Sequence, residues 1–285
     1  MQMSALDNSQ PITVIVPYYR GSAFLDGLRD SLADQSAREV IIVVDGGEEL
    51  ELVETHLAQL QGLRVLTTRE ALGTAGARNF GARYATQDWI TFLDQDDHWP
   101  PGFLKDLFCQ VSTDVLAYDN DLFEEKTGHP RRDLKKSVFE EAGWSKSRLS
   151  RYDSADLLSG FPMVKLLLTK VSFQSVGGYR ESVFAVEDFD LVWRLIASGN
   201  ELTFVTQPRG SYTVRPDSIT GRIAAGDPGS TLKALRSWAS IWTRMTLTSS
   251  LPLFTRAGAA RRALRTYGRI AKNRLKRFRV FRPRS

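Results

Sequence analysis

Three carboxylates within four residues, Asp94, Asp96 and Asp97, are the group in this sequence best suited to chemistry. Such closely spaced acids repel one another unless a cation lies among them. Their oxygen ligands suit Mg²⁺ or Mn²⁺, ions that commonly bind through one or two carboxylates together with the phosphates of a substrate. The cluster therefore predicts a metal site for a substrate that carries a diphosphate. The structural alternative is an acidic turn before a helix that begins at Pro101.

The first 120 residues must supply the elements that position this cluster, and they alternate between short apolar runs and helix-like stretches. Continuous β-branched runs indicate buried strands, and apolar residues three or four apart indicate helices. The βαβαβαβ order predicts an α/β fold, with a mainly parallel, Rossmann-like sheet flanked by helices on both faces. The predicted strands are Ile12 to Val16, Val40 to Val44, Leu63 to Thr67 and Trp89 to Leu93. The predicted helices are one capped by Ser22 with Leu25, Leu28 and Leu32 on its apolar face, Glu48 to Leu60 with Leu52, Leu57 and Leu60 toward the core, Thr74 to Thr86, and Pro101 to Val111.

Polar or turn-forming residues follow three of these strands directly. They are Pro17-Tyr18-Tyr19, Asp45-Gly46-Gly47 and the acidic cluster of residues 94–97. Ligands of parallel α/β sheets bind outside the carboxyl ends of the strands, so all three segments are expected on one rim. This convergence favours a functional site over an acidic turn.

Four further residues are candidates on weaker grounds. Asp45 could bind a base or ribose, or could form the turn before a helix. Arg78 lies near the start of a helix aimed at the rim, where it could meet a phosphate or base, or pair with a surface acid. Glu187 and Asp188 open a helix, where acids stabilise the helix dipole by about 0.3–1 kcal/mol, and one of them could instead be a general base.

The second half of the chain is less regular. Asn120 to Ser159 is polar and charged and predicts a loop-rich excursion with one or two short helices. An apolar run from Pro162 to Thr169 is strand-like, and Glu187 to Ser198 is a helix that Gly199 ends. Strands at Leu202 to Thr206 and Ser211 to Val214 and a helix at Thr231 to Thr246 follow, with Leu235, Trp238 and Trp242 on one face of that helix.

Composition limits the class of protein. The chain of 285 residues is 42% hydrophobic and 25% charged, which is typical of a globular protein. Its single cysteine, Cys109, excludes an intramolecular disulfide, and no apolar run is long enough to span a membrane. The N-terminus has no signal-peptide core. We therefore expect a cytoplasmic protein.

Together these segments resemble the inverting family 2 glycosyltransferases of the GT-A fold, over Ile12 to about Thr220. Four segments carry this resemblance, in the family's order and spacing: ITVIVPYYRGSAFLDGLRDSL, EVIIVVDGG, GTAGARNFGARYATQDWITFLDQDD and GGYRESVFAVEDFDLVWRL. The resemblance implies transfer of a single sugar from a nucleotide-sugar, expected to be a UDP-sugar, to an acceptor hydroxyl with inversion. Surface polysaccharide or lipopolysaccharide-type glycan synthesis is the implied setting, with a glycan or glycolipid as acceptor.

The resemblance also implies roles by position. Asp188 would be the catalytic base and Glu187 would lie near the acceptor. Asp96, supported by Asp97, would hold Mn²⁺ or Mg²⁺. The nucleotide-sugar pocket would be formed by Pro17, Tyr18, Asp45, Arg78, Asp94 and Arg215.

Two departures from the family pattern matter. In the segment from Tyr212 to Ser218, Arg215 occupies the position at which the family often has a histidine. An arginine cannot ligate a metal, but it can pair with a phosphate. The Q-x-x-R-W motif and the spanning helices of processive synthases are absent from the sequence, which favours single-sugar transfer.

The C-terminal segment has its own charge. Residues 256–285 hold 12 basic and no acidic residues, which leaves 26 basic and 33 acidic residues for the rest. The spacing predicts an amphipathic helix from Arg256 to Phe281 that contacts an anionic membrane, making the protein peripheral on its inner face. The alternatives are a helix packed on the body or a nucleic-acid-binding tail. The predicted apolar face is Ala257, Ala260, Leu264, Tyr267, Ala271, Leu275, Phe278 and Phe281.

These features predict a GT-A domain over 1–222, with a nucleotide-binding half at about 11–120 and an acceptor-side half at about 121–222. A helical extension would cover 223–285. A dinucleotide oxidoreductase would need G-x-G-x-x-G after the first strand, and a haloacid-dehalogenase phosphatase D-x-D-x-T or V, and neither pattern is present. The non-enzymatic alternative is an inactive GT-A-like protein that binds through its basic tail to a membrane or to nucleic acid.

Overall fold

The computed structural model describes residues 9–125, 130–131 and 165–280, and for residues 122–125, 130–131, 214 and 273–280 only the backbone. The short helices expected within Asn120 to Ser159 and the first residues of the run Pro162 to Thr169 lie outside the described residues. So does Phe281 of the predicted tail helix.

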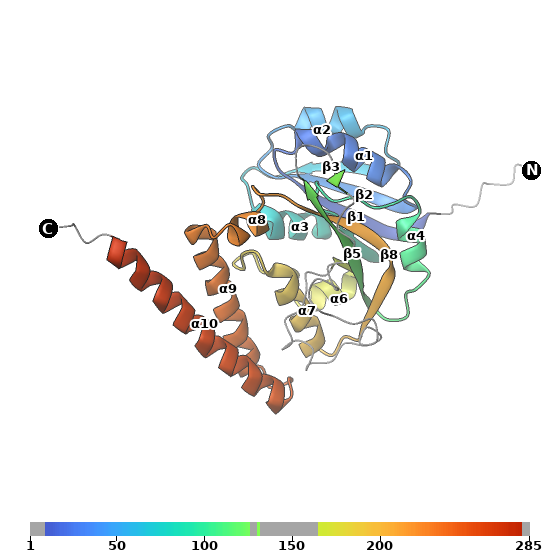
Figure 1. Cartoon of the computed structure of the whole chain (residues 1–285). Helices are drawn as coiled ribbons and strands as arrows, with labels where there is room; N and C mark the ends of the chain where they lie inside the picture. The colour runs from blue at the N-terminus through green and yellow to red at the C-terminus, as the bar shows by residue number, and fades with distance from the viewer. Residues whose placement is uncertain (1–8, 126–129, 132–164, 281–285) are drawn as a thin grey trace, which may run out of the picture.

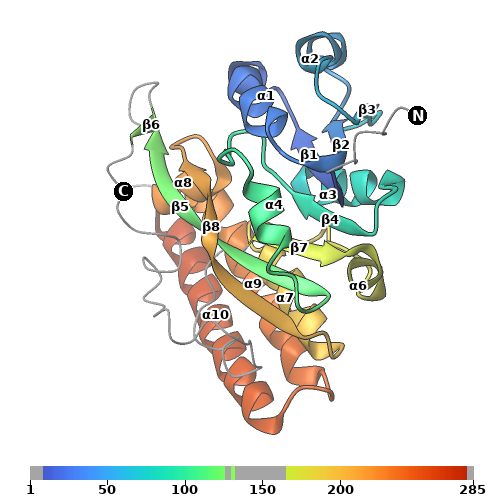
Figure 2. The ribbon, with the colours of Figure 1, turned by 90° about the vertical axis from the view of Figure 1, so that its right-hand side faces the viewer.

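One eight-stranded sheet organises the described chain (Figures 1 and 2), with strand order β3-β2-β1-β4-β7-β5-β6 and with β8 beside β5. The first four strands are parallel, as predicted, and β7 runs antiparallel between β4 and β5. The strands are β1 (Gln10–Tyr18), β2 (Ala37–Val44), β3 (Leu63–Thr67), β4 (Trp89–Phe92), β5 (Val115–Glu125), β6 (Pro130–Arg131), β7 (Lys165–Thr169) and β8 (Leu202–Val214).

Helices cover both faces of this sheet. One face carries η1 (Ser22–Phe24), α1 (Leu25–Ala33), α2 (Leu50–Leu57) and α4 (Phe103–Phe108). The other carries α3 (Gly73–Tyr84), α6 (Lys170–Ser175) and α7 (Glu187–Ala197), followed in the chain by α8 (Ile219–Ala224), α9 (Pro228–Leu247) and α10 (Leu253–Val280). This is the α/β, GT-A-type architecture that the sequence predicts, with a C-terminal helical extension.

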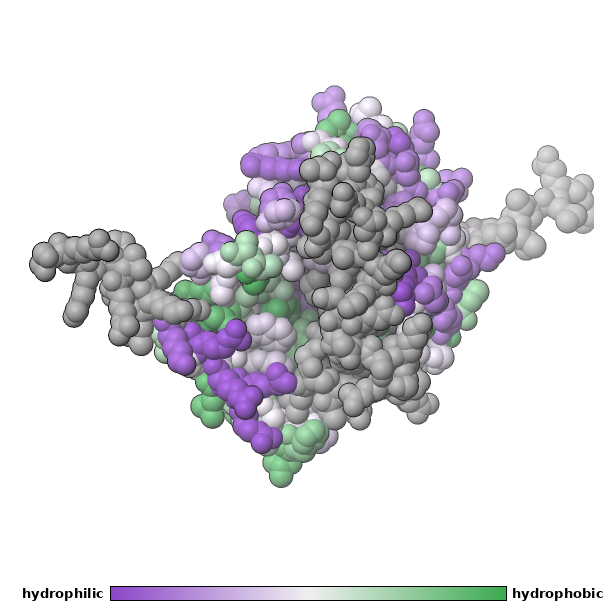
Figure 3. Space-filling view, viewed as in Figure 1, coloured by the Kyte–Doolittle hydropathy of each residue, from purple (hydrophilic) through white to green (hydrophobic). Residues whose placement is uncertain are grey.

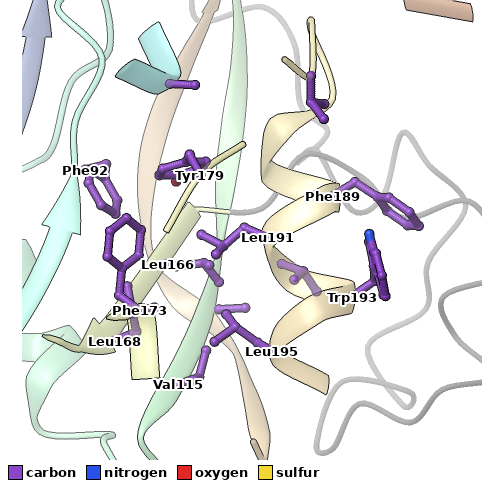
Figure 4. Close-up of a cluster of buried hydrophobic side chains, with 14 of the residues drawn as sticks. Phe92, Val115, Leu166, Leu168, Phe173, Tyr179, Phe189, Leu191, Trp193 and Leu195 are labelled. Carbon is purple, nitrogen blue, oxygen red and sulfur yellow. The ribbon is translucent and has the colours of Figure 1, made fainter. Parts of the chain in front are cut away.

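Side chains of the central strands point alternately to the two faces of the sheet and so contribute to both halves of the core. Val14 and Val16 of β1 face the α1 side, whereas Ile15 between them faces the α3 side. Successive side chains of a strand point to opposite faces, so a run that is buried on both faces is continuously apolar. In Figure 4, Leu191 and Leu195 point from α7 toward the strands, beside Leu166 and Val115.

Several predicted boundaries are wrong for local reasons. Pro17 lies inside β1 rather than ending it, because β4 pairs with β1 only as far as Ile15 and leaves the neighbouring edge unpaired. Ser22 caps no α-helix, since a 3₁₀ turn comes first and its side chain makes no cap bond. Leu52 is 43% exposed, and Val53 takes its place in the core. Pro101 precedes α4, which begins at Phe103.

The two strands predicted between Leu202 and Val214 are one strand, β8. Gln207-Pro208, at which the sequence pattern breaks, is a cis peptide bond within it. The ladder between β5 and β8 shifts register between Tyr118 and Asn120 and then continues to Val214. The strand therefore reaches the same rim as the acidic cluster, and brings Tyr212, Thr213 and Arg215 with it.

The helices α9 and α10 lie side by side in both ribbon views (Figures 1 and 2). Trp242 is buried, and the half-buried Trp238 stacks on it with ring centroids 5.3 Å apart; both rings contact Phe189 of α7. The side of α10 that packs on α9 is not the predicted apolar face. Small residues make this contact, including Thr255, Ala259 and Ala263, all of them buried.

Gly81 allows α3 to approach the sheet closely. A Cβ atom there would lie 2.5 Å from Cγ2 of Ile15 and 3.1 Å from Cγ2 of Val43. We predict that Gly81→Ala lowers the melting temperature by a few degrees, because overpacking of about 1–3 kcal/mol outweighs the gain in helix propensity of about 0.5–1 kcal/mol.

The matched control is Gly27→Ala in α1, where nothing lies within 4 Å of the added atom. That variant should melt at or above the wild-type temperature in the same thermal scan. Equal effects of the two substitutions would contradict close packing of α3 as the reason.

Candidate active site

A cleft of about 410 Å³ opens at the carboxyl ends of the parallel strands. Eight of the ten site residues predicted from the sequence line it, and they come from segments up to 198 residues apart. These eight are Pro17, Asp45, Arg78, Asp94, Asp96, Glu187, Asp188 and Arg215. The rim predicted from the strand order is therefore a single cleft.

Tyr18 and Asp97 do not line the cleft. Tyr18 is buried, and its hydroxyl donates to Oε2 of Glu49 at 2.7 Å. Its neighbours Pro17 and Tyr19 face the cleft instead, because side chains alternate along the strand. Tyr19 therefore has the position that the sequence analysis assigned to Tyr18.

Asp97 is also buried, and it links the loop after β4 to β8. Its Oδ1 accepts the backbone N–H of Thr213 at 2.9 Å, and the Thr213 hydroxyl donates to the carbonyl of Asp96 at 2.6 Å. Burial, followed by the nearby acids Asp94 and Asp96, raises the pKa of Asp97 to about 7. Asp97 thus supports the loop from below and does not face a ligand in the cleft.

Arg78 lies at the centre of the site. Its side chain is only 3% exposed, and its guanidinium meets three carboxylates: Nη2 lies 2.5 Å from Oδ1 of Asp94, and Nη1 lies 3.4 Å from Glu187 and 3.3 Å from Asp188. The ring of Tyr179 lies 5.2 Å from the guanidinium carbon. The sequence predicts Arg78 on a phosphate or base, whereas in the structure its guanidinium pairs with the acids around it.

Lys165, at the start of β7, is a cleft residue that the sequence analysis did not single out. Its Nζ lies 2.5 Å from Oδ2 of Asp94 and 3.0 Å from Oδ2 of Asp97. Its signal in the sequence is a lone lysine within the apolar run Pro162 to Thr169, because a lysine is rarely buried unless it is paired. Arg78 and Lys165 together occupy both oxygens of Asp94 and hold its pKa well below the usual range, against the effect of burial.

Asp96 faces the cleft and pairs with Arg215. Nε of Arg215 donates to Oδ2 of Asp96 at 2.9 Å, and the guanidinium stacks 4.5 Å above the ring of Phe24. Burial and then Asp94 raise the pKa of Asp96, while Arg215 opposes the shift. The residue that departs from the family pattern therefore contacts the predicted metal ligand directly.

Asp45 organises the loop that leads into α3. It is 4% exposed, and its carboxylate accepts the backbone N–H groups of Leu72 and Gly73, each at 2.8 Å, and the hydroxyl of Thr68 at 2.9 Å. Gly46, which follows it, has φ +87°, a conformation that glycine adopts without strain. Asp45 thus forms the turn and also lines the cleft, and its binding of a base or ribose stays a prediction.

Glu187 and Asp188 begin α7 directly at the cleft. The preceding Ala185 also lines the cleft and has φ +65°, a strained conformation for a residue with a Cβ atom. Burial, followed by the charge of Asp188, raises the pKa of Glu187 to about 7, and Arg78 opposes the shift. The pair is therefore more than a cap on the helix dipole, because two adjacent acids are held in a desolvated cleft beside one cation.

The donor atoms of the cleft fit a hard divalent cation only in part. Asp94 is occupied by Arg78 and Lys165, and Asp97 is buried, so the carboxylate of the acidic cluster that faces the cleft is Asp96, whose Oδ2 pairs with Arg215. Within the described ranges no group of three or more His, Cys, Asp or Glu side chains could hold a metal. One carboxylate completed by substrate phosphates is a common arrangement for magnesium-type ions, and the site fits an ion bound in that way.

Comparisons with known proteins give the chain relatives among glycosyltransferases. A family model described as glycosyl transferase family 2 matches residues 13–159. The chain is 26% identical over 208 residues to a pre-mycofactocin glycosyltransferase of Mycobacterium tuberculosis, covering 68% of this chain and 40% of the relative. It is 28% identical over 201 residues to the succinoglycan biosynthesis protein ExoU of Rhizobium meliloti, covering 67% of this chain and 58% of the relative. The alignments thus span about half the length of these relatives.

Solved structures share the fold. Staphylococcus aureus TarS 1-349 in complex with UDP-GlcNAc is similar with a TM-score of 0.66 at 17% identity, covering 90% of this chain and 72% of the other. The mannosyltransferase PcManGT from Pyrobaculum calidifontis in complex with GDP-Man and Mn²⁺ is similar with a TM-score of 0.61 at 15% identity, covering 92% and 76%. At these identities the likeness concerns the fold alone.

The raised pKa of Glu187 predicts a pH-dependent stability. The folded protein binds this proton more tightly than the unfolded chain, so stability present in acid is lost as the pH rises from the usual glutamate range to about 7. Glu187→Gln removes the ionisation. Its melting temperature, measured by scanning calorimetry, should therefore rise by a few degrees relative to wild type between pH 5 and pH 8.

Glu51→Gln, at an exposed position of α2, is the control and should follow wild type at every pH. A difference between Glu187→Gln and wild type that is constant with pH would contradict a desolvated carboxyl group at residue 187.

Proposed function

The chain belongs to glycosyl transferase family 2, and from that premise we propose that it transfers a single sugar from a nucleotide-sugar to an acceptor hydroxyl with inversion at the anomeric carbon. The observation that carries the proposal is the cleft itself. Its acid pair Glu187 and Asp188 faces the same space as Asp96 and Arg215, so a base and a diphosphate-binding group serve one ligand site.

A UDP-sugar is the proposed donor. Pro17 and Asp45 would line the nucleotide end, with Asp45 toward the base, and Asp94 would lie toward the ribose or sugar. The support for Asp45 is its rigidity, since three donors hold its carboxylate at the cleft wall. Arg78 is proposed to keep Asp94, Glu187 and Asp188 in place, because its guanidinium is committed to all three.

Asp96 is the proposed ligand of Mn²⁺ or Mg²⁺, with Asp97 supporting its loop from within the protein. When bound, such an ion would stabilise negative charge on the departing nucleoside diphosphate. Arg215 would pair with the diphosphate. Its pairing with Asp96 supports this role. The guanidinium already lies in the cleft against one anion, the Asp96 carboxylate, and would bind the diphosphate in place of that carboxylate.

Asp188 is the proposed general base. It would take the proton of the acceptor hydroxyl while that oxygen bonds to the anomeric carbon and the nucleoside diphosphate leaves with the electrons of the broken bond. Glu187 would lie beside the acceptor. The strained backbone at Ala185 supports a positioned acid pair, because such strain persists only where the surrounding structure holds it.

The acceptor is proposed to be a glycan or glycolipid of a cell-surface polysaccharide or lipopolysaccharide type. Residues 1–222 are proposed to form the GT-A domain and residues 223–285 a helical extension, whose basic end, 256–285, would contact an anionic membrane from the cytoplasmic side. No helix in the described part of the chain is long and apolar enough to cross a membrane. An inactive protein that binds through its tail is the alternative, and the intact acid pair argues against it.

The donor can be tested by calorimetric titration of UDP and of GDP, each with and without Mn²⁺. We expect UDP binding that Mn²⁺ strengthens at least tenfold, and loss of that gain in Asp96→Asn because the proposed ligand is neutral. Asp106→Asn, an exposed acid on α4, is the matched control and should bind as wild type does. A preference for GDP would change the donor class, and no binding of either nucleotide would overturn the proposal.

The base can be tested without knowing the acceptor, by following release of UDP from a panel of UDP-sugars with water as acceptor. Asp188→Asn should lower the turnover rate by about 10²–10⁴ and leave the dissociation constant for UDP within about threefold, since a general base acts on the acceptor. A loss of turnover that only follows a loss of UDP binding, or no loss at all, would contradict this role for Asp188.

A further inference from the structure

Helix α10 has two different faces. The face toward α9 is made of small side chains and is buried at Thr255, Ala259, Ala263 and Thr266. At 3.6 residues per turn, the positions Leu253, Ala257, Ala260, Leu264, Tyr267 and Ala271 form a second stripe, about a third of a turn away from the buried one. A helix that only packs on the body needs one apolar side, so the second requires an explanation.

The second stripe is exposed to solvent. Leu253 is 78% exposed, Leu264 is 73% exposed and Tyr267 is 51% exposed. Two more large apolar side chains, Leu247 at the end of α9 and Phe254, are exposed by 74% and 59% at the turn between the helices. In Figure 3 hydrophobic residues gather at this turn, at the bottom of the molecule. We call Leu247, Leu253, Phe254, Leu264 and Tyr267 the hairpin face.

The two helices of the hairpin carry only basic charges. From Pro228 to Ser285 the sequence has 15 basic and no acidic residues. Arg261, Arg265, Arg269 and Lys272 follow one flank of the stripe at intervals of three or four residues, and all four are exposed. Long basic side chains beside an apolar stripe can keep their charges in a headgroup layer while their stems cover apolar surface.

The surface continues onto α9. A groove of about 390 Å³ between the two helices is lined by Arg236, Ser240 and Arg244 from α9 and by Tyr267 and Ile270 from α10. Tyr267 of the stripe therefore stands at the edge of a groove that carries two more arginines. Apolar side chains, hydroxyls and guanidinium groups thus meet on one side of the hairpin.

We propose that the hairpin face docks on an anionic lipid surface, with Leu253, Phe254 and Leu264 in the acyl boundary and the arginines of α9 and α10 at the headgroup phosphates. Charge complementarity selects this occupant, since each basic residue near such a surface contributes about 1 kcal/mol. Nucleic acid would use the arginines and leave the leucines exposed to water. The lipid surface uses both.

The docking gives the enzyme an orientation. Helix α9 begins shortly after α8, and residues 218–220 and 222 around α8 line the cleft. A hairpin that lies along the membrane would hold that side of the cleft near the lipid. This consequence rests on the proposed function, because it explains how an enzyme of this kind would meet a lipid-linked acceptor. The docking itself does not require sugar transfer.

The test is co-sedimentation of the full chain with vesicles of phosphatidylcholine alone or mixed with phosphatidylglycerol. We expect binding to the anionic vesicles only. The double variant Leu253→Ser/Leu264→Ser should bind at least tenfold more weakly, although its charge is unchanged. Val171→Ser, an equally exposed apolar residue on α6 at 75%, is the matched control and should bind as wild type does. The triple variant Arg261→Gln/Arg265→Gln/Arg269→Gln should lose the preference for anionic lipid.

Other occupants give different results. Equal binding by the double leucine variant and wild type would overturn the proposal, as would tight binding of single-stranded RNA with no binding to vesicles. A wild-type dimer in light scattering that the leucine variant loses would assign the face to a second copy and also overturn it. Calorimetric titration with UDP separates this test from the function, because hairpin variants should bind the nucleotide unchanged whether or not they bind vesicles.

Discussion

The buried guanidinium of Arg78 is the contact on which the site depends. It joins the end of β4, through Asp94, to the start of α7, through Glu187 and Asp188, and these segments are about one hundred residues apart in the chain. Breaking a buried ion pair by removing one partner commonly costs about 3–5 kcal/mol, because the other charge remains desolvated. The two sides of the cleft, one at the end of β4 and the other at the start of α7, are therefore held together by buried ion pairs, whereas apolar contacts hold the sheet below them together.

The sheet makes that contact achievable. The parallel strands β1, β2 and β4 end at one rim, so the residues that follow them lie close together. Helix α3 approaches closely at Gly81 and thereby carries Arg78 beneath the acids. On the other side, Thr213 of β8 is bonded to both Asp96 and Asp97. The backbone of the sheet and of α3 therefore fixes where the cleft residues lie, and ion pairs between buried charges hold their side chains in place.

The parallel half of the fold and most of the cleft could be predicted, because a continuous β-branched strand followed by a polar turn has a local signal. The sequence predicts Tyr18 in the cleft in place of Tyr19, because Pro17 suggests that the strand ends one residue earlier than it does and so hides which side chains face the cleft. Lys165 was missed since its meaning depends on two acids about 70 residues away. On α10, hydrophobic periodicity predicts the helix and its apolar stripe, but it does not predict which side of the helix packs on α9. The helix packs through small residues, which contribute little to such a pattern.

The count of charges in the cleft accounts for two of its unusual features. Seven acids stand against four cations: Asp45, Asp94, Asp96, Asp97, Glu187, Asp188 and Asp217 against Arg78, Lys165, Arg215 and Arg222. With every group ionised these residues would carry three excess negative charges, and the raised pKa values of Asp97 and Glu187, both about 7, mark where protons relieve that excess. A divalent cation at Asp96 would offset most of the same excess and free Arg215 from its carboxylate. The arginine that stands where the family often has a histidine would then be available to the diphosphate of the proposed donor, so the departure and the acidic cluster would form one arrangement of charge.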